Sequence, residues 1–419
     1  MKPERLDIKK EMLTWAVTRY GLSVEEYAQK NPAFSKWINE ERKPTFKQLE
    51  EFANSVYVPL GYLFLDEPPV ETVPIPMFRS GGGSVSLNVM DEVRKVQERQ
   101  EWLSSYIEGN GIEAPSYVGS IATDTPIETT CQTIRNILGL SLDWAFKEYS
   151  MGDAIRKLVT RMEDSGTMVC INNMVGNNIF RKISVSDCRG FALIDKNAPF
   201  IFVNGGDAQV AQTFTLIHEF VHVLIGYESG VGDEDSIVNS SDDERYCDKV
   251  AAHFLVPEGL FRQVWTGDTE DVYPQLAKRF KVSRYTIARR AAELNFISRA
   301  RQFQLFAIWK NEPIPHKDNS GHPPFRTMAL RRISPTFMIH LSNAAHANKI
   351  LYLDAYRLAG LKGDTFHNDM TGNQLSWPLN SLWTTGMMPS VTRLSPMLCL
   401  TELYTHHTVS NSSAKASER

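Results

Sequence analysis

Residues 213–225 read Thr-Phe-Thr-Leu-Ile-His-Glu-Phe-Val-His-Val-Leu-Ile. The apolar residues predict a helix, and helical spacing places His218 and His222 one turn apart on the same face. Two imidazole nitrogens in this arrangement can hold one zinc ion, and Glu219 lies beside them to take a proton from a water molecule. Polar side chains in an apolar helix need partners, which favours a metal site over a chance match. The spacing is typical of zinc hydrolases.

A zinc peptidase site needs a third protein ligand and leaves the fourth position for water. The acidic candidates downstream are Asp233, Glu234, Asp235, Asp242, Asp243, Glu244 and Asp248. We expect Glu244 to be the ligand, because it begins a helical segment, 244–257, whose Ala251 and Ala252 allow close packing against the first helix. Asp248 lies one turn further on the same face, where it can hydrogen-bond a ligand histidine. The acidic residues at 233–235 are expected to lie in a solvated loop.

The two segments HEFVHVLIG (218–226) and ERYCDKVAAHFLVP (244–257) together resemble the ImmA/IrrE family of zinc metallopeptidases. The usual family pattern is HExxH followed by E-x-x-A-N-x-F-A-A-x-L-L-M-P. The resemblance makes Glu244 the third zinc ligand, whereas Cys247 and Asp248 replace the alanine and asparagine of the pattern. It implies a metallo-endopeptidase whose substrate is a cognate transcriptional repressor or antitoxin. Residues 189–195 and 199–204 resemble the paired strands that precede the family's active-site helix.

Residues 1–66 are expected to form a separate domain of four or five short helices, because apolar runs are split at 21–23, 31–32 and 44–45. The segments 21–28 and 34–50 resemble the helix-turn-helix of lambda-repressor-like regulators. That resemblance implies a groove helix at 33–38, with Ser35, Lys36 and Asn39 contacting DNA. The domain has balanced charge, and four glutamates at 25, 26, 40 and 41 would face phosphates. A protein docking module is therefore an equal alternative.

The rest of the chain divides into four parts. Residues 67–87 form a connector rich in proline and glycine, and 88–300 form the peptidase domain. Within that domain we expect a long helix at 88–108, helices over 127–163, and strands at 167–171, 179–185 and the paired stretches above. Helices, then a small sheet, then the active-site helix predict an α+β fold. Residues 301–368 are expected to be a helical extension, and 369–419 an altered or disordered tail.

Residues 276–295 predict two further helices joined at Val282-Ser283. Arg284, Arg289 and Arg290 on the second helix either form a basic nucleic-acid patch or belong to a unit packed on the peptidase core.

Composition narrows the setting of these domains. The chain has 419 residues and a net charge of -4, which gives no global attraction to nucleic acid. It lacks an apolar run long enough for a membrane span and an apolar leader, so we expect a cytoplasmic protein without membrane partners. Five cysteines without a CxxC pair indicate reduced thiols rather than disulfides or a cysteine zinc site.

The sequence therefore predicts a zinc-dependent endopeptidase coupled to a DNA-binding domain in gene regulation. His218, His222 and Glu244 hold Zn²⁺, and Glu219 acts as the base. Two alternatives remain open: a DNA-binding regulator or antitoxin of a toxin-antitoxin or phage locus with little peptidase activity, and a hydrolase acting on a substrate other than protein. The oligomeric state is not predicted.

Overall fold

The computed structural model describes residues 4–69, 86–226, 240–310 and 325–361, with residues 363 and 366. By its contacts the chain divides into one compact unit at 1–370 and a second at 371–419, and the described residues all belong to the first. Most of the predicted connector and the whole tail at 369–419 lie outside the described residues, as do the acids at 233–235.

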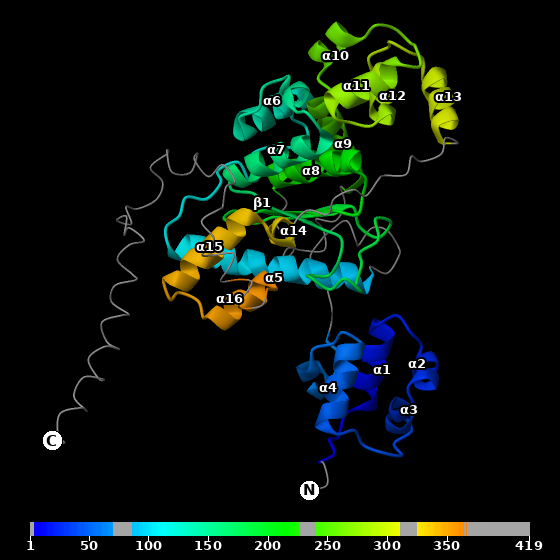
Figure 1. The fold of residues 1–419 in the computed structure, drawn as a ribbon, viewed down its shortest axis with the longest axis vertical. Coiled ribbons are helices and arrows are strands. Elements are labelled where there is room, and N and C mark those ends of the chain that lie inside the picture. The colour runs from blue at the N-terminus through cyan, green and yellow to red at the C-terminus, as the bar shows by residue number, and fades with distance from the viewer. Residues whose placement is uncertain are drawn as a thin grey trace, which may run out of the picture. The chain divides into compact units, whose positions relative to one another are not determined.

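The N-terminal residues form a small helical bundle, shown in blue in Figure 1. It consists of α1 (Lys10–Arg19), α2 (Val24–Lys30), α3 (Pro32–Ile38), α4 (Phe46–Ser55) and the short 3-10 helix η1 (Leu60–Phe64). Ser23 caps the N-terminus of α2: its hydroxyl accepts a hydrogen bond from the Glu26 amide, and the Glu26 carboxylate accepts one from the Ser23 amide. Phe34 is buried between Tyr27 and Phe52. This aromatic core holds the helices together.

A mixed three-stranded sheet lies at the centre of the larger domain. Its strands are β1 (Met168–Asn172), β2 (Gly190–Leu193) and β3 (Phe200–Asn204) in the order β1-β3-β2. Strand β3 runs parallel to β1 and antiparallel to β2. The strand predicted at 179–185 is wrong: this segment forms turns around Gly176 and Asn178, with one isolated bridge between Met174 and Lys182. Turn residues outweigh the local β-propensity there.

Alternate residues of each strand face different helical layers, as the two-residue period of a strand requires. Val169, Ile171, Ile201 and Val203 join one apolar core with α7 (Met151–Asp164), α8 (Gln209–Ile225) and α9 (Ser240–Leu255). Met168, Cys170, Phe200 and Phe202 join another with α5 (Leu87–Gly109), α14 (Phe325–Ile333), α15 (Pro335–His346) and α16 (Tyr352–Ala359). Figure 1 shows the sheet between these layers. The α+β prediction is confirmed.

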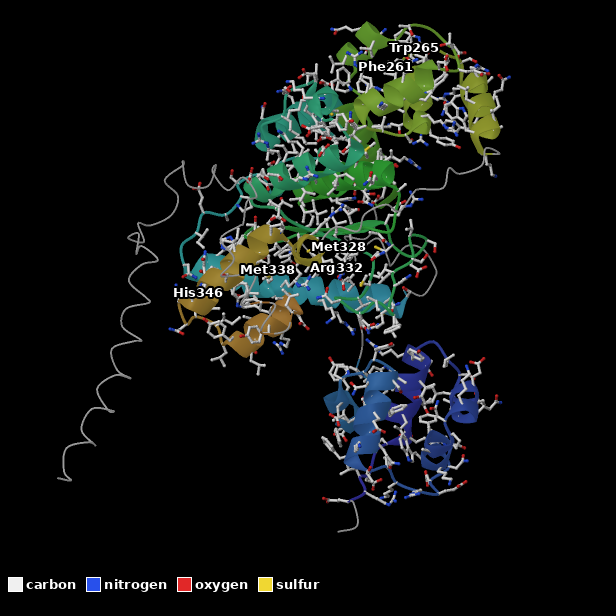
Figure 2. All side chains as sticks on the ribbon, in the orientation of Figure 1. Phe261, Trp265, Met328, Arg332, Met338 and His346 are labelled. Carbon is white, nitrogen blue, oxygen red and sulfur yellow. The ribbon has the colours of Figure 1, made fainter. Side chains whose placement is uncertain are left out.

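Further helices extend the α8 side of the sheet: α6 (Ile127–Leu138), η3 (Trp144–Lys147), α10 (Glu258–Val264), α11 (Val272–Phe280), α12 (Arg284–Glu293) and α13 (Arg299–Lys310). Phe261 of α10 and Trp265, the residue that follows this helix, are labelled in Figure 2; their rings stack with centroids 5.3 Å apart and pack in the same core. None of the described helices combines the length and the apolar character that a bilayer crossing requires.

The C-terminal end of α8 lies against residues 117–121. The amides of Gly119 and Ile121 donate to the carbonyls of Val223 and Leu224, so two groups at the helix end have partners. Gly226 then ends α8 with φ +70°, a conformation that glycine adopts readily. A Cβ atom at 226 would overlap the Cα of Gly119 and lie 2.6 Å from its nitrogen. Both the backbone conformation and the space require glycine.

We expect Gly226→Ala to destabilise the domain by about 2 kcal/mol or more, because left-handed backbone strain adds to overlap with Gly119. The midpoint of thermal unfolding should fall by roughly 5 °C. Gly259→Ala on α10 is the matched control, because a Cβ there meets no atom within 4 Å. An unchanged midpoint for Gly226→Ala would contradict the close contact between α8 and residues 117–121.

Candidate metal centre

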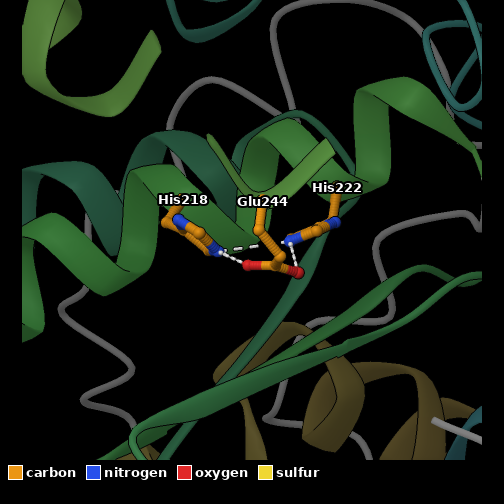
Figure 3. A group of neighbouring side chains, drawn as sticks. All are labelled: His218, His222 and Glu244. Carbon is orange, nitrogen blue, oxygen red and sulfur yellow. Dashed lines mark hydrogen bonds and ion pairs between the residues drawn. The ribbon is translucent and has the colours of Figure 1, made fainter. Parts of the chain in front are cut away.

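Three side chains from α8 and α9 converge at one point (Figure 3). The Nε2 atoms of His218 and His222 lie 3.2 Å apart. One Glu244 oxygen lies 3.2 Å from His218 Nε2, and the other lies 3.3 Å from His222 Nε2. In the described parts of the chain, these residues form the one group of three or more His, Cys, Asp or Glu side chains close enough to hold a metal ion.

The spacing of the donor atoms suits a tetrahedral ion. Ligand atoms bonded to zinc at about 2.0–2.1 Å are separated by roughly 3.3–3.4 Å along the edges of a tetrahedron. The two imidazole nitrogens lie 3.2 Å apart, close to that value, and each lies 3.2 or 3.3 Å from a different oxygen of the Glu244 carboxylate. Two imidazoles and one carboxylate are also a ligand set found in catalytic zinc sites. The donor set therefore fits a divalent metal with one coordination position left for water or substrate.

The packing of α9 on α8 brings Glu244 to the two histidines. Helix α9 begins at Ser240, four residues earlier than predicted, so Glu244 lies one turn inside it. Ala251 of the small pair is fully buried in the core, whereas Ala252 lines the cleft in front of the site. The helix thus keeps a small residue on the side that meets α8 and another on the side that faces the cleft.

Each ligand histidine has a neighbour at its second ring nitrogen. His218 Nδ1 lies 3.1 Å from the Asp248 carboxylate, and His222 Nδ1 lies 3.8 Å from Cys247 Sγ. A carboxylate at Nδ1 holds a proton there and leaves Nε2 free to bind the metal. Asp248 therefore has the geometry of a residue that orients a ligand. Cys247 is fully buried, and burial raises the pKa of its thiol.

The electrostatics of the site favour a bound cation. Burial disfavours protonation of His218, but hydrogen bonds to Asp248 and Glu244 outweigh it and raise the pKa of His218 to about 10. Burial likewise opposes ionisation of Glu244, yet its hydrogen bonds with the two histidines lower the pKa of that carboxyl to about 2. The carboxylates attract positive charge to the point where the nitrogen atoms meet. A divalent metal provides that charge while the imidazoles stay neutral.

Glu219 follows His218 in α8, and only 3% of it is exposed. Its Oε2 atom is buried and has no hydrogen-bond partner among the described residues, and burial raises the pKa of the carboxyl. A buried carboxylate oxygen without a partner is costly unless a ligand, water or substrate completes it. Gly190 at the start of β2 lies close enough that a Cβ atom there would meet Thr215 and sit 3.1 Å from Glu219 Oε1. The edge strand therefore passes directly beside this carboxylate.

A cleft of about 870 Å³ opens in front of these residues. Its lining comes from the first half of α8, from residues 185–190, from α9 through Glu244, Asp248 and Ala252, and from α12 through Ser283, Tyr285, Thr286 and Arg289. The contributions of 185–190 and α12 were not predicted. No spacing pattern connects them with the HExxH segment, because tertiary packing alone brings them to the cleft.

The other acidic candidates do not join the site where the structure describes them. Asp242 is exposed and pairs with Arg245 at 2.7 Å, and Asp243 is not part of the metal-binding group. Residues 233–235 lie outside the described residues.

The DNA contacts predicted for the N-terminal bundle fall on or beside α3. Lys36 and Asn39 are exposed there and Ser35 is half-buried. A single residue, Asn31, joins α2 to α3, whereas DNA-reading helix pairs usually have a turn of about 3–4 residues.

Comparison with protein families agrees with this site. Residues 174–292 match the family model described as the IrrE N-terminal-like domain, a metallopeptidase-like domain of the ImmA/IrrE family. The match contains both segments that carry the metal ligands, and it ends in α12. Residues 333–369 match a domain of unknown function, DUF8813. No curated protein matches the chain. Neither family match covers the N-terminal bundle, so its helix-turn-helix identity stays a prediction.

We expect Glu244→Ala, His218→Ala and His222→Ala to lose most of the bound metal, because each removes one of three protein donors. Metal per chain after gel filtration, measured by plasma mass spectrometry, checks this. Asp242→Ala removes a nearby exposed carboxylate and should keep the metal. Asp248→Asn should keep the metal with an affinity about 10–100 times weaker. Full metal content in Glu244→Ala, with loss in Asp242→Ala, would contradict the ligand assignment.

Proposed function

We propose that the domain containing residues 174–292 is a zinc-dependent endopeptidase. The observation that carries this proposal is the convergence of His218, His222 and Glu244 beside the buried Glu219, whose Oε2 lacks a partner among the described residues. Zinc is the metal that best suits two imidazoles and one carboxylate in this geometry. The metallopeptidase-like family match at 174–292 supports hydrolysis of a peptide bond.

Zinc held by these ligands supplies Lewis-acid chemistry: it polarises a carbonyl group and makes water more acidic. The residues of the chain do the rest. Glu219 accepts the proton of the attacking water and then donates it to the leaving amine nitrogen. Burial raises the pKa of this carboxyl. Asp248 keeps His218 oriented through its Nδ1 atom.

The cleft offers a way to hold an extended peptide. Strand β2 is at one edge of the sheet and begins at Gly190, which lies next to Glu219. A peptide that pairs with this edge would bring its backbone past the metal centre. By resemblance to the ImmA/IrrE family, we propose a transcriptional repressor or an antitoxin as the protein substrate, so that cleavage changes gene expression.

Glu219→Gln should keep its metal and lose roughly a hundredfold or more of its peptidase rate, because the amide cannot take up the proton. Cleavage of unfolded casein measures the rate, and metal content measured on the same preparation serves as the control. Wild-type rates in Glu219→Gln would refute the role of Glu219 as the base. A zinc-loaded wild-type protein that cleaves no peptide bond would refute the endopeptidase proposal and leave hydrolysis of another substrate.

As a second activity we propose that the N-terminal bundle binds DNA through α3. This proposal rests on the exposed Lys36 and Asn39, which are three residues apart and therefore project from one side of the helix end. A lysine there suits a phosphate and an asparagine suits a base edge. The single-residue connection between α2 and α3 favours the alternative, a protein docking module. A regulator with little peptidase activity would need only this domain.

Lys36→Ala should weaken binding to duplexes of any sequence and reduce the salt slope by about 1, because one phosphate contact is lost. Gel-shift titrations at several salt concentrations measure both quantities. Lys47→Ala on α4 makes the same charge change at another exposed lysine and should leave binding unchanged. Absence of binding by the wild-type protein at low salt would contradict DNA recognition and favour docking.

A further inference from the structure

The second helix pair, α11 and α12, does not present the basic face that its sequence suggests. Arg290 is 2% exposed, and it donates to the Val256 carbonyl and pairs with Glu293 at 2.8 Å. Arg284 lies over the Trp309 ring, 4.9 Å from its centroid. Arg290 therefore cannot belong to an exposed basic patch, and Ile287, Ala288 and Ala291 of this unit pack on the peptidase core. Of the three arginines on α12, Arg289 is the one whose surroundings have still to be described.

Arg289 is exposed and lines the cleft in front of the metal centre. Among the described residues no carboxylate lies within ion-pair distance of it. A solvated arginine costs little on an open surface. In a concave cleft it is a charge positioned to meet a ligand, because low-dielectric walls strengthen its attraction for an anion.

Arg189 brings a second cation to the same cleft from a different lining segment, residues 185–190. Its side chain is 68% exposed, and its closest carboxylate, Asp207, is 4.0 Å away. Such a pair at the distance limit contributes little and leaves the guanidinium available. Arg189 immediately precedes the edge strand β2, so it lies where a peptide paired with that strand would pass.

The acids of the cleft do not cancel these arginines. Glu244 and Asp248 bond the metal-site histidines, and Glu219 is buried beside them. The proposed divalent cation would offset the charge of these carboxylates. Away from the metal centre, the ionised lining residues are Arg189, Arg289 and the exposed Asp187. The outer cleft thus carries one net positive charge, contributed by two guanidinium groups against one carboxylate.

We propose that the cleft selects peptides with an acidic side chain close to the scissile bond, which Arg289 and Arg189 recognise. This inference rests on the proposed endopeptidase function and adds a substrate class to it. A guanidinium forms paired hydrogen bonds with a carboxylate, a geometry that lysine does not match. Specificity also has a repulsive side, because a lysine or arginine of the peptide at that position would meet two like charges.

The test is cleavage profiling of the zinc-loaded full-length protein on a peptide library prepared from a digested proteome. Mass spectrometry of the products gives the residues around each cleaved bond. We expect Asp and Glu to be enriched at one or two positions beside that bond. Arg289→Glu and Arg189→Glu should each lower kcat/KM for a selected acidic peptide by tenfold or more. The double variant should favour a matched peptide with lysine at the same position.

Lys278→Glu is the matched control, because it makes the same charge reversal at an exposed residue of the neighbouring α11 that does not line the cleft. It should leave the profile and kcat/KM unchanged. Arg289→Gln removes the charge without reversing it and should reduce the acidic preference. Metal content of each variant shows that the centre is intact.

The outcomes separate the two levels of the proposal. If the wild-type protein cleaves no peptide in the library, the endopeptidase proposal itself fails. If it cleaves peptides without enrichment of Asp or Glu, the function stands and the acidic preference is refuted. An acidic preference that persists in the double variant, or that Lys278→Glu abolishes equally, would also overturn the assignment to Arg189 and Arg289.

Discussion

The meeting of the His218, His222 and Glu244 side chains between α8 and α9 is the constraint on which the site depends. Two imidazoles and a carboxylate lie within 3.3 Å of one another, in a region where burial makes uncompensated charge expensive. A cation between them would remove this cost, and the packing of α9 on α8 is what brings the three side chains together. The same packing buries most of Glu219 and places His218 and Glu244 in the lining of the cleft.

Helix α8 packs against strands β2 and β3 of the sheet. Glycines on both sides of the contacts allow α8 to approach its neighbours closely. At Gly190 the edge strand passes beside Glu219, and at Gly226 the helix ends against Gly119. A side chain at either position would push α8 away from its neighbours by the width of a methyl group. Catalytic geometry requires positions accurate to about half an ångström, so these backbone contacts belong to the site as much as its ligands do.

The acidic and basic side chains of the cleft lie in different places. Glu244 and Asp248 contact the two histidines, whereas Arg189 and Arg289 lie away from the candidate metal centre and are exposed. Arg284, Arg289 and Arg290 illustrate how the fold assigns different roles to identical side chains. One lies over an aromatic ring, one is buried against a carbonyl and a carboxylate, and one faces the cleft. In sequence they form one cluster of positive charge.

The sequence by itself determined the features that depend on local spacing: the HExxH helix, Glu244 in the following helix, the long helix at 88–108 and the helix that follows Ser283. Periodicity and capping act over a few residues and so can be read along the chain. The tertiary structure alone decided that 179–185 forms turns, that Glu219 Oε2 is buried without a partner, and that 185–190 and α12 line the cleft. These features arise from contacts between residues far apart in sequence. The packing energy of such contacts depends on the whole fold, so a local sequence pattern does not predict them.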